Sequence, residues 1–338
     1  MAQIKNIALV CGGYSKEYDV SIRSAAEVAK QIDTKKYNLY KIVIDKNKWY
    51  YLPDGCEPLA ADTTSVVQPC AVVDKNDFSI TLTGEHIRFD MAFIIIHGTP
   101  GEDGLLQGYF DMLRIPYNTC NACVSAITFN KAYCNAVLAH NGVRVAPSVR
   151  LFKDIAFNEA EVLNVVGLPC FVKPNAGGSS VGVTKVKRSE DLSAAIARAF
   201  DEDNEILIEK FIAGREYSCG LINDKVLPLT EIISETEFFD YEAKYEGKSK
   251  EVTPAEAPVA LTAEIAEISR RVYDILHCFG VVRCDYIVEE KTGQVFFLEV
   301  NTVPGQSAQS IVPQQVRAAG KTLKEFYQSI IDECRLNP

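Results

Sequence analysis

The first third of the chain has the hydrophobic pattern of alternating strands and helices. Short apolar runs at 4–10, 37–45 and 91–96 are typical of buried strands. Between the first two runs, residues 19–31 have the apolar spacing of an amphipathic helix, and a second helix is expected over 104–113. Strands that alternate with helices indicate an open, mainly parallel sheet covered on both faces.

The pattern departs from this alternation in two places. Residues 46–90 contain turn residues between short alternating runs, which predict a small added sheet or hairpins. Residues 122–141 predict two helices with a break near 128–130, and a compact α+β unit is expected from about 144. The strands of that unit are predicted within 144–152, 168–174, 180–186 and 204–212, and its helices within 157–165 and 189–200.

A third unit, also α+β, is expected after about residue 214. Its strands are predicted within 217–222, 225–232, 282–288 and 295–301, and its helices within 261–278 and 322–334. The polar stretch 234–257 has no regular pattern, and a loop of that length inside a compact domain is usually functional or mobile. We therefore expect three units, comprising residues 1–122, 123–214 and 215–338.

The predicted hairpin 282–301 carries a concentrated group of polar side chains. Because side chains alternate along a strand, Arg283 and Asp285 point the same way, and so do Glu299 and Asn301. A pairing that places both sets on one face gathers two carboxylates, an amide and a guanidinium among apolar neighbours. Two interpretations are open. The group is either a buried Arg–Asp ion pair with Glu299 at a strand end, or a site for Mg²⁺, which prefers oxygen ligands and completes its coordination with water and phosphate.

The loop 173–182, KPNAGGSSVG, lies between two predicted strands. Its glycines would let backbone N–H groups approach phosphate oxygens, Ser179 and Ser180 would add donors, and Lys173 would add a positive charge. Taken alone, the loop fits an ordinary hairpin connection better. The chain contains neither a Walker A loop nor a GxGxxG motif, so any ATP site must use another architecture.

Other candidates have a simpler alternative as well. Glu17, in the loop before the first predicted helix, suits a cationic substrate group, and His97 lies at the sheet edge where open α/β folds bind ligands. The segment 206–216 could frame an adenine or be a polar linker. Lys131 and Lys244, considered singly, are typical of solvated surface charges.

Composition excludes several classes of protein. The net charge of −10 over 338 residues, with no basic cluster, argues against nucleic-acid binding. No apolar stretch approaches the length that spans a membrane, and the apolar run near the N-terminus is too short for a secretory signal. The eleven cysteines are scattered singly, which favours reduced thiols and a cytoplasmic location.

Taken together, the motifs resemble those of the D-alanine–D-alanine ligases of the ATP-grasp superfamily over almost the whole chain. The segments that carry the resemblance are GGYSKEYDVS (12–21), HGTPGEDGLLQG (97–108), VKPNAGGSSVGV (172–183), IEKFIAGRE (208–216), FFDYEAKY (238–245), RCDYIV (283–288) and LEVNTVPGQSAQSIVP (298–313). The resemblance implies three domains, with ATP between the central and C-terminal ones and a mobile loop over 234–257. It also implies a homodimer.

The resemblance implies how ATP and metal would be bound. Asp285, Glu299 and Asn301 would hold two Mg²⁺ ions, which Mn²⁺ could replace, on the phosphates of ATP. The contacts with ATP itself would come from Lys131, Lys173, Ser180, Glu209, Lys210, Ile212, Glu216 and Lys244.

The resemblance also implies sites for two D-alanines. Glu17, with His97 nearby, would receive the ammonium group of the first, and Ser310 with the Ile311 backbone would hold the carboxylate of the second. The product would be D-alanyl-D-alanine for peptidoglycan precursors. A D-serine or D-lactate second substrate, or another carboxylate–amine pair, remains the alternative.

The chemistry implied is acyl transfer through an acyl phosphate. The first D-alanine would attack the γ-phosphate of ATP, and the amine of the second would then attack the acyl carbon. Arg283 and the Gly305 N–H would stabilise the tetrahedral oxyanion. Glu17, Ser179 and Tyr245 would form the relay that removes a proton from the incoming ammonium.

Overall fold

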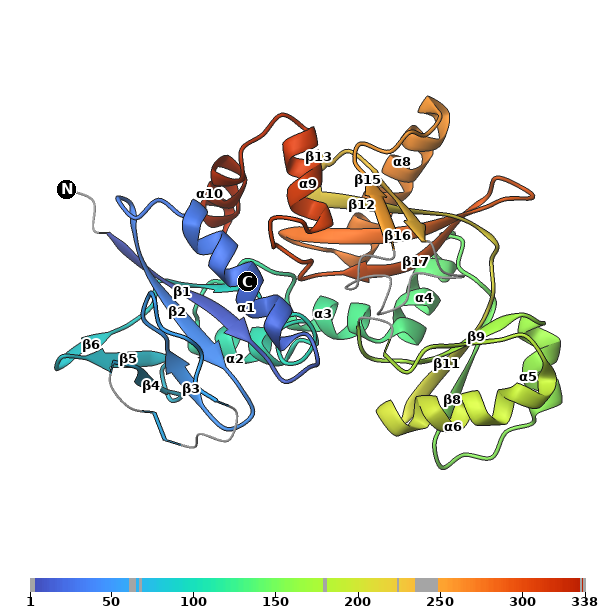
Figure 1. The fold of residues 1–338 in the computed structure, drawn as a ribbon, viewed down its shortest axis with the longest axis horizontal. Coiled ribbons are helices and arrows are strands. Elements are labelled where there is room, and N and C mark those ends of the chain that lie inside the picture. Colours follow the sequence, from blue (N-terminus) through green and yellow to red (C-terminus); the bar gives the residue numbers. More distant parts are fainter. Residues whose placement is uncertain are drawn as a thin grey trace.

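The computed structural model describes residues 4–60, 65–66, 69–178, 181–223, 225–234, 249–334 and 336, without the side chains of 234 and 249. Four predicted site residues, Ser179, Ser180, Lys244 and Tyr245, lie outside this part of the chain, as does most of the predicted loop 234–257. Three β-sheets with their covering helices make up the molecule (Figure 1). In the described part of the chain, no helix has the length and apolarity needed to cross a membrane.

The N-terminal sheet has seven strands in the order β6-β5-β4-β3-β2-β1-β7. Its centre is parallel, with β1 (Lys5–Gly12) between β2 (Tyr37–Ile44) and β7 (Met91–Ile94). The other strands are β3 (Trp49–Tyr51), β4 (Ala71–Asp74), β5 (Ser79–Leu82) and β6 (Glu85–Ile87), and all of them pair antiparallel. The expectation of a mainly parallel sheet was therefore wrong beyond the centre. Residues 46–90 extend the same sheet. Their strands pair antiparallel because a parallel pair needs a crossover connection, and the described parts of these connections contain no crossover helix.

Two helices flank the centre of this sheet, α1 (Tyr18–Gln31) and α2 (Leu105–Leu113). The crossover from β1 through α1 to β2 follows the predicted order. The loops after β1 and β7 leave from the same edge of the sheet because their strands are parallel. That edge carries Glu17 and His97.

The central sheet is antiparallel, in the order β10-β9-β11-β8. Its strands are β8 (Ser148–Phe152), β9 (Cys170–Pro174), β10 (Thr184–Val186) and β11 (Glu205–Lys210), and its helices are α5 (Glu159–Val166) and α6 (Leu192–Glu202). Apolar residues of both helices form one buried cluster with β9 and β11. The glycine-containing loop joins β9 to β10, as the sequence predicted.

The C-terminal sheet has the order β15-β14-β12-β16-β17, with β13 paired to β12. Its strands are β12 (Gly214–Ile222), β13 (Lys225–Val226), β14 (Thr230–Ser234), β15 (Ser249–Val252), β16 (Val281–Glu289) and β17 (Val295–Asn301). The helices of this part are α8 (Val259–Leu276), α9 (Ile311–Ala318) and α10 (Leu323–Glu333). Strand β15 and helix α9 were not expected. Residues 249–252 of the stretch 234–257 thus form an edge strand on β14 rather than irregular loop.

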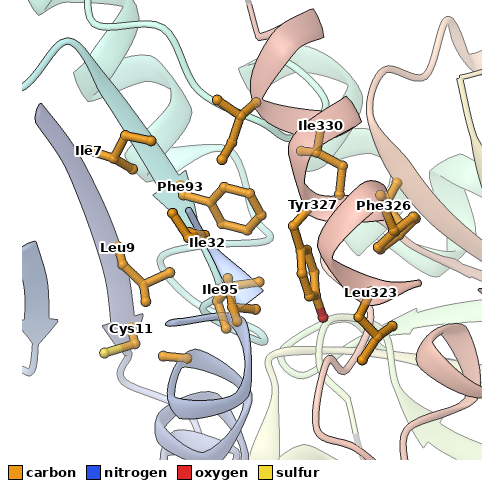
Figure 2. Close-up of a cluster of buried hydrophobic side chains, with 14 of the residues drawn as sticks. Ile7, Leu9, Cys11, Ile32, Phe93, Ile95, Leu323, Phe326, Tyr327 and Ile330 are labelled. Atoms are coloured by element: carbon orange, nitrogen blue, oxygen red, sulfur yellow. The ribbon is translucent and has the colours of Figure 1, made fainter. Parts of the chain in front are cut away.

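Two packing arrangements join these units. Helices α3 (Ala122–Phe129) and α4 (Lys131–His140) share a buried cluster with β12, β16 and α8. Helix α10 instead packs on the N-terminal sheet, where Tyr327 and Ile330 face Phe93 and Ile95 (Figure 2). Residues more than 200 positions apart therefore share one core, and the end of the chain stabilises its beginning.

Candidate active site

The β16–β17 hairpin places four polar side chains together as the alternation of its strands predicted. Arg283 is paired with Asn301, and Asp285 is paired with Glu299. The Arg283 guanidinium donates from Nε to Asp285 Oδ1 at 3.0 Å and from a terminal nitrogen to Oδ2 at 2.8 Å. The amide nitrogen of Asn301 lies 3.2 Å from Asp285 Oδ2 and 3.5 Å from Glu299 Oε1.

This group is largely withdrawn from solvent. Asp285 is 4% exposed, and the hydroxyl of Ser218 on β12 donates to its Oδ1 at 2.6 Å. Burial by itself lowers the pKa of Arg283, but the charges of Asp285, Glu299 and Glu102 outweigh it and raise that pKa well above its ordinary value. The guanidinium is therefore a fixed positive charge in the site.

A cavity of about 320 Å³ opens in front of the hairpin. It is lined by residues from all three parts of the chain. The predicted residues among its walls are Glu17, His97, Lys131, Arg283, Glu299, Asn301, Gly305, Ser310 and Ile311. Glu102, Glu251 and Arg23 also line it, although no motif or spacing in the sequence predicted a role for them.

The loop between β9 and β10 reaches this cavity from the central unit. The Lys131 ammonium donates to the Gly177 carbonyl at 2.6 Å, and the Lys131 N–H donates to the Asn175 carbonyl. The backbone of Gly178 lies against Glu17, since a Cβ at that position would be 2.7 Å from Glu17 Oε2. The glycine thus permits the central unit and the first helix to meet at the Glu17 carboxylate.

The other predicted ATP residues that the structure describes lie outside the walls of this cavity, on β9, β11 and β12 or the link between the last two. Lys173 on β9 pairs with the buried Glu209 on β11, with 2.7 Å between Nζ and Oε2. The Glu209 carboxylate also accepts from the Asn135 amide at 3.4 Å. Lys210 is exposed, Ile212 is buried, and Glu216 is partly buried. Lys173 and Glu209 are therefore brought together, with opposite charges in contact.

His97 and Glu102 form a second polar group at the edge of the N-terminal sheet. His97 is 5% exposed, and its Nδ1 lies 2.7 Å from the Val303 carbonyl oxygen. Glu102 accepts from the Val303 N–H at 3.1 Å and from the Gly98 N–H at 3.0 Å. Burial lowers the pKa of His97, whereas burial and the Glu17 charge raise the pKa of Glu102 to about 7.

At the opposite wall, helix α9 presents its N-terminus. Ser310 is the N-cap residue, and its hydroxyl lies 2.8 Å from that of Ser307. A Cβ on Gly305 would be 2.9 Å from Ser310 Oγ, so the Gly305 backbone runs directly beside this helix start. Free N–H groups at a helix N-terminus suit a carboxylate.

The hairpin face fits a divalent cation by the chemistry of its donors. Across the described ranges, no group of three or more His, Cys, Asp or Glu side chains is arranged to hold a metal ion. The candidate here is a different set, two carboxylates and the amide of Asn301. Rotation of that amide would present its oxygen, since amide orientation is assigned from hydrogen bonds. Three oxygen donors suit Mg²⁺, which takes further ligands from phosphate and water.

Some residues of the site were missed because their partners are distant in sequence. Glu102 belongs to the motif HGTPGEDGLLQG, yet its contact with Val303 crosses about two hundred residues. Glu251 lies in the polar stretch, where burial raises its pKa and its Oε2 accepts from Gln314 of α9 at 2.6 Å. A carboxylate inside a quoted motif was the available signal for Glu102.

The chain matches two family models over most of its length. Residues 6–120 match the D-ala D-ala ligase N-terminus, and residues 137–332 match the D-ala D-ala ligase C-terminus. A D-alanine–D-alanine ligase of Phocaeicola vulgatus is 48% identical over 333 residues, which cover 97% of this chain and 98% of that protein.

Solved structures agree with the sequence matches. The VanG D-Ala:D-Ser ligase of Enterococcus faecalis is 30% identical, with a TM-score of 0.84 over 98% of this chain and 99% of that one. The D-alanine–D-alanine ligase of Bacillus anthracis complexed with ATP is 28% identical, with a TM-score of 0.76 over 97% of this chain and 96% of that one. The resemblance inferred from the motifs is confirmed.

Proposed function

The chain belongs to the D-alanine–D-alanine ligase family, and we propose that the cavity in front of the β16–β17 hairpin is its active site. The protein is an ATP-dependent ligase with the ATP-grasp fold, and it joins two D-alanines to the dipeptide used in peptidoglycan synthesis. The observation that carries the site assignment is the convergence of Glu17, Lys131, Arg283 and Glu299 on one cavity from three parts of the chain.

In this proposal the first D-alanine binds between the N-terminal sheet edge and the hairpin. Glu17 receives its ammonium group, with His97 nearby. The carboxylate is then directed toward the positive charges of Arg283 and Lys131, where the γ-phosphate of ATP is attacked. Phosphoryl transfer needs alignment and charge neutralisation more than covalent help, which suits these residue types.

The second D-alanine binds at the start of α9. Ser310 and the Ile311 N–H hold its carboxylate, which the helix N-terminus favours. Its amine attacks the acyl phosphate, and Arg283 with the Gly305 N–H stabilises the oxyanion. The proposed proton relay from Glu17 continues through Ser179 and Tyr245, which lie outside the described residues.

The ATP and metal assignments follow the same arrangement. Asp285, Glu299 and Asn301 would hold two Mg²⁺ ions, or Mn²⁺ in their place, which would neutralise the phosphate charge. Lys173 lies on β9, the strand that precedes the loop between β9 and β10, and Glu209 lies beside it on the neighbouring strand β11. The other proposed nucleotide contacts are Lys131, Ser180, Lys210, Ile212, Glu216 and Lys244.

The second substrate defines the alternative. The VanG structure is that of a D-Ala:D-Ser ligase, and its fold agrees with this chain as closely as those of D-alanine ligases do. Tyr245 favours an amino nucleophile over a hydroxy acid, because the resemblance places a tyrosine there in ligases that use an amine. D-Serine is therefore the alternative to D-alanine at the α9 subsite.

The experiment that tests the proposal measures phosphate release from ATP and Mg²⁺ with D-alanine, L-alanine, D-serine or D-lactate, and identifies the products by mass. We expect release that requires D-alanine and yields D-alanyl-D-alanine. Mixed product from D-alanine and D-serine would support the alternative. If neither D-alanine nor D-serine caused phosphate release, the site assignment would be contradicted.

We also propose a cytoplasmic homodimer that binds neither nucleic acid nor membrane. The net charge of −10 supports the absence of nucleic-acid binding. The dimer is inferred from the family resemblance, and sedimentation at several protein concentrations tests it.

A further inference from the structure

Val303 is held through both of its backbone polar groups by side chains of the N-terminal unit. Its N–H donates to Glu102 Oε1 at 3.1 Å, and its carbonyl oxygen lies 2.7 Å from His97 Nδ1. A carbonyl oxygen can only accept, so His97 must carry its proton on Nδ1. His97 and Glu102, both in the loop after β7, therefore hold the backbone of Val303, which follows β17.

The same network fixes the chain again three residues later. His97 Nε2, the unprotonated nitrogen, lies 3.2 Å from the hydroxyl of Ser24, which must donate to it. The Ser24 oxygen in turn accepts from the Gln306 N–H at 3.2 Å. The second oxygen of Glu102 is also used, because it accepts from the Gly98 N–H.

The segment 301–305, which is held at Val303, has a proposed functional group at each end. Asn301, a proposed metal ligand, lies two residues before Val303, and Gly305, the proposed oxyanion donor, lies two residues after it. Gly305 is thus suspended between two fixed points, Val303 and Gln306. A catalytic donor has to be held within about half an ångström of its working position, and a misplacement of about 1 Å can cost roughly a hundredfold in rate.

We propose that Glu102 is a positioning residue: through the Val303 N–H, and together with His97, it sets the place of the Gly305 N–H at the reaction centre. The inference rests on the proposed role of Gly305 in the ligase reaction. Glu102 need not touch either D-alanine. It acts by fixing the backbone that does.

Displacement of the Gly305 N–H would change the ratio of the reaction products. The intact enzyme converts one ATP and two D-alanines into one ADP, one phosphate and one dipeptide. If Gly305 is displaced, attack by the amine slows more than formation of the acyl phosphate. Water then attacks the acyl carbon of the accumulating intermediate and releases D-alanine and phosphate without a dipeptide. The ratio of phosphate to dipeptide should therefore rise above one.

The variant that tests this is Glu102→Gln, which keeps the size of the side chain. A glutamine has one oxygen to accept and one nitrogen to donate, so it can satisfy the N–H of Gly98 or of Val303 but not both. Asp103→Asn is the matched control. Asp103 is the neighbouring carboxylate, and it accepts from the Leu105 N–H at the start of α2.

We expect Glu102→Gln to lower the rate of dipeptide formation roughly 10- to 100-fold and to raise the phosphate-to-dipeptide ratio clearly above one. The KM for ATP should stay within about twofold, and Asp103→Asn should behave as the parent. A parental rate for Glu102→Gln, or a loss of rate with the ratio still at one, would overturn the proposal. The second result would assign Glu102 a purely structural role.

A measurement that does not depend on activity tests the hydrogen bond between His97 and Val303. Nitrogen NMR of the parent protein, with His97→Gln to assign the signals, should show His97 protonated on Nδ1 and not on Nε2. The opposite tautomer would remove the bond to Val303 and overturn the inference. A parent enzyme that makes no dipeptide would contradict the proposed function instead. The imidazole signals would still decide whether His97 donates to the Val303 carbonyl.

Discussion

The charge of Glu102 couples the stability of the protein to pH. Its pKa is raised from 4.5 to about 7, by burial first and by the Glu17 charge second. The folded state therefore holds a proton on this carboxyl over a pH range in which the unfolded state has lost it. Glu17, His97 and Arg283 are the charged or titratable groups whose electrostatic influence reaches the same region.

The proton that Glu102 retains in the folded state stabilises that state. We predict that this stabilisation is complete below about pH 4.5 and is lost as the pH rises toward 7. Relative to Glu102→Gln, the parent should lose at most about 1.4 kcal/mol per pH unit in that window and no more above it. Urea unfolding of both proteins at several pH values between about 4.5 and 8 measures the difference. Parallel pH profiles for the two proteins would contradict the shift.

Gly178 offers a second prediction at the scale of one residue. A Cβ there would be 2.7 Å from Glu17 Oε2, the flexible end of a side chain, so Gly178→Ala should displace the carboxylate rather than the backbone. We expect the KM for the first D-alanine to rise several-fold, with stability changed by less than about 0.5 kcal/mol. Steady-state kinetics at saturating ATP measure this.

Gly108→Ala is the control for the same chemical change. Gly108 lies within helix α2, and a Cβ there would be at an ordinary contact distance of 3.9 Å from the Ala122 Cβ of α3. Stability should stay equal or rise slightly, as for Gly to Ala within a helix. An unchanged KM in Gly178→Ala would show that Glu17 does not meet the substrate.

Single residues of the site were predictable where local periodicity decides their direction. The alternation of strands placed Arg283 with Asp285 and Glu299 with Asn301 before the pairing was known. The same reasoning could not show that Ser24 and Glu102 meet one backbone segment, because helix α1, the loop after β7 and the end of β17 come together only in the tertiary structure. Local pattern carries no information about such contacts.

At the scale of elements, long periodic segments were predicted and short ones were missed. Helix α8 and the β16–β17 hairpin have clear patterns, whereas α9 spans eight residues in a segment rich in polar side chains. Strand β15, SKEV, has only one apolar residue and is stabilised by its pairing with β14. Their structure depends on neighbouring elements rather than on their own composition.

Helix α9 is attached to the site sheet through a buried glutamine. Gln315 is fully buried, accepts from the Gly220 N–H at 3.0 Å and donates to the Ser218 carbonyl at 2.9 Å. We predict that Gln315→Met, similar in size, lowers the free energy of unfolding by roughly 2 kcal/mol or more, because it leaves two buried backbone groups unpaired.

The same change should raise the KM for the second D-alanine more than that for ATP, since Ser310 begins this helix. Chemical denaturation and substrate saturation measure the two effects. Gln31→Met is the control, because the Gln31 amide donates to Glu27 within its own helix at a partly exposed position. Equal stability of the two variants would show that Gln315 does not anchor α9.

At the scale of the whole molecule, the proposed active site lies where the three units meet. The N-terminal unit contributes Glu17 and Glu102, the central unit contributes the loop between β9 and β10, and the C-terminal unit contributes the β16–β17 hairpin. The motifs predicted several of the residues that line this cavity. They did not predict that α10 closes the core of the N-terminal sheet, because an amphipathic helix does not specify its partner.

This packing predicts how the molecule unfolds. Phe326 is 3% exposed in the buried cluster that α10 shares with the N-terminal sheet, so Phe326→Ala should cost about 3 to 5 kcal/mol and loosen that sheet first. Trp49, the only tryptophan in the sequence, lies on β3 of the same sheet, so its fluorescence reports that unit while far-ultraviolet circular dichroism reports all three.

In the parent the tryptophan fluorescence and the circular dichroism should change together as the urea concentration is raised. In Phe326→Ala the tryptophan signal should change first. Phe157→Ala, at a position 40% exposed on the central unit, should leave the signals coincident. Coincident transitions in Phe326→Ala would mean that the N-terminal sheet does not depend on α10 for its separate stability.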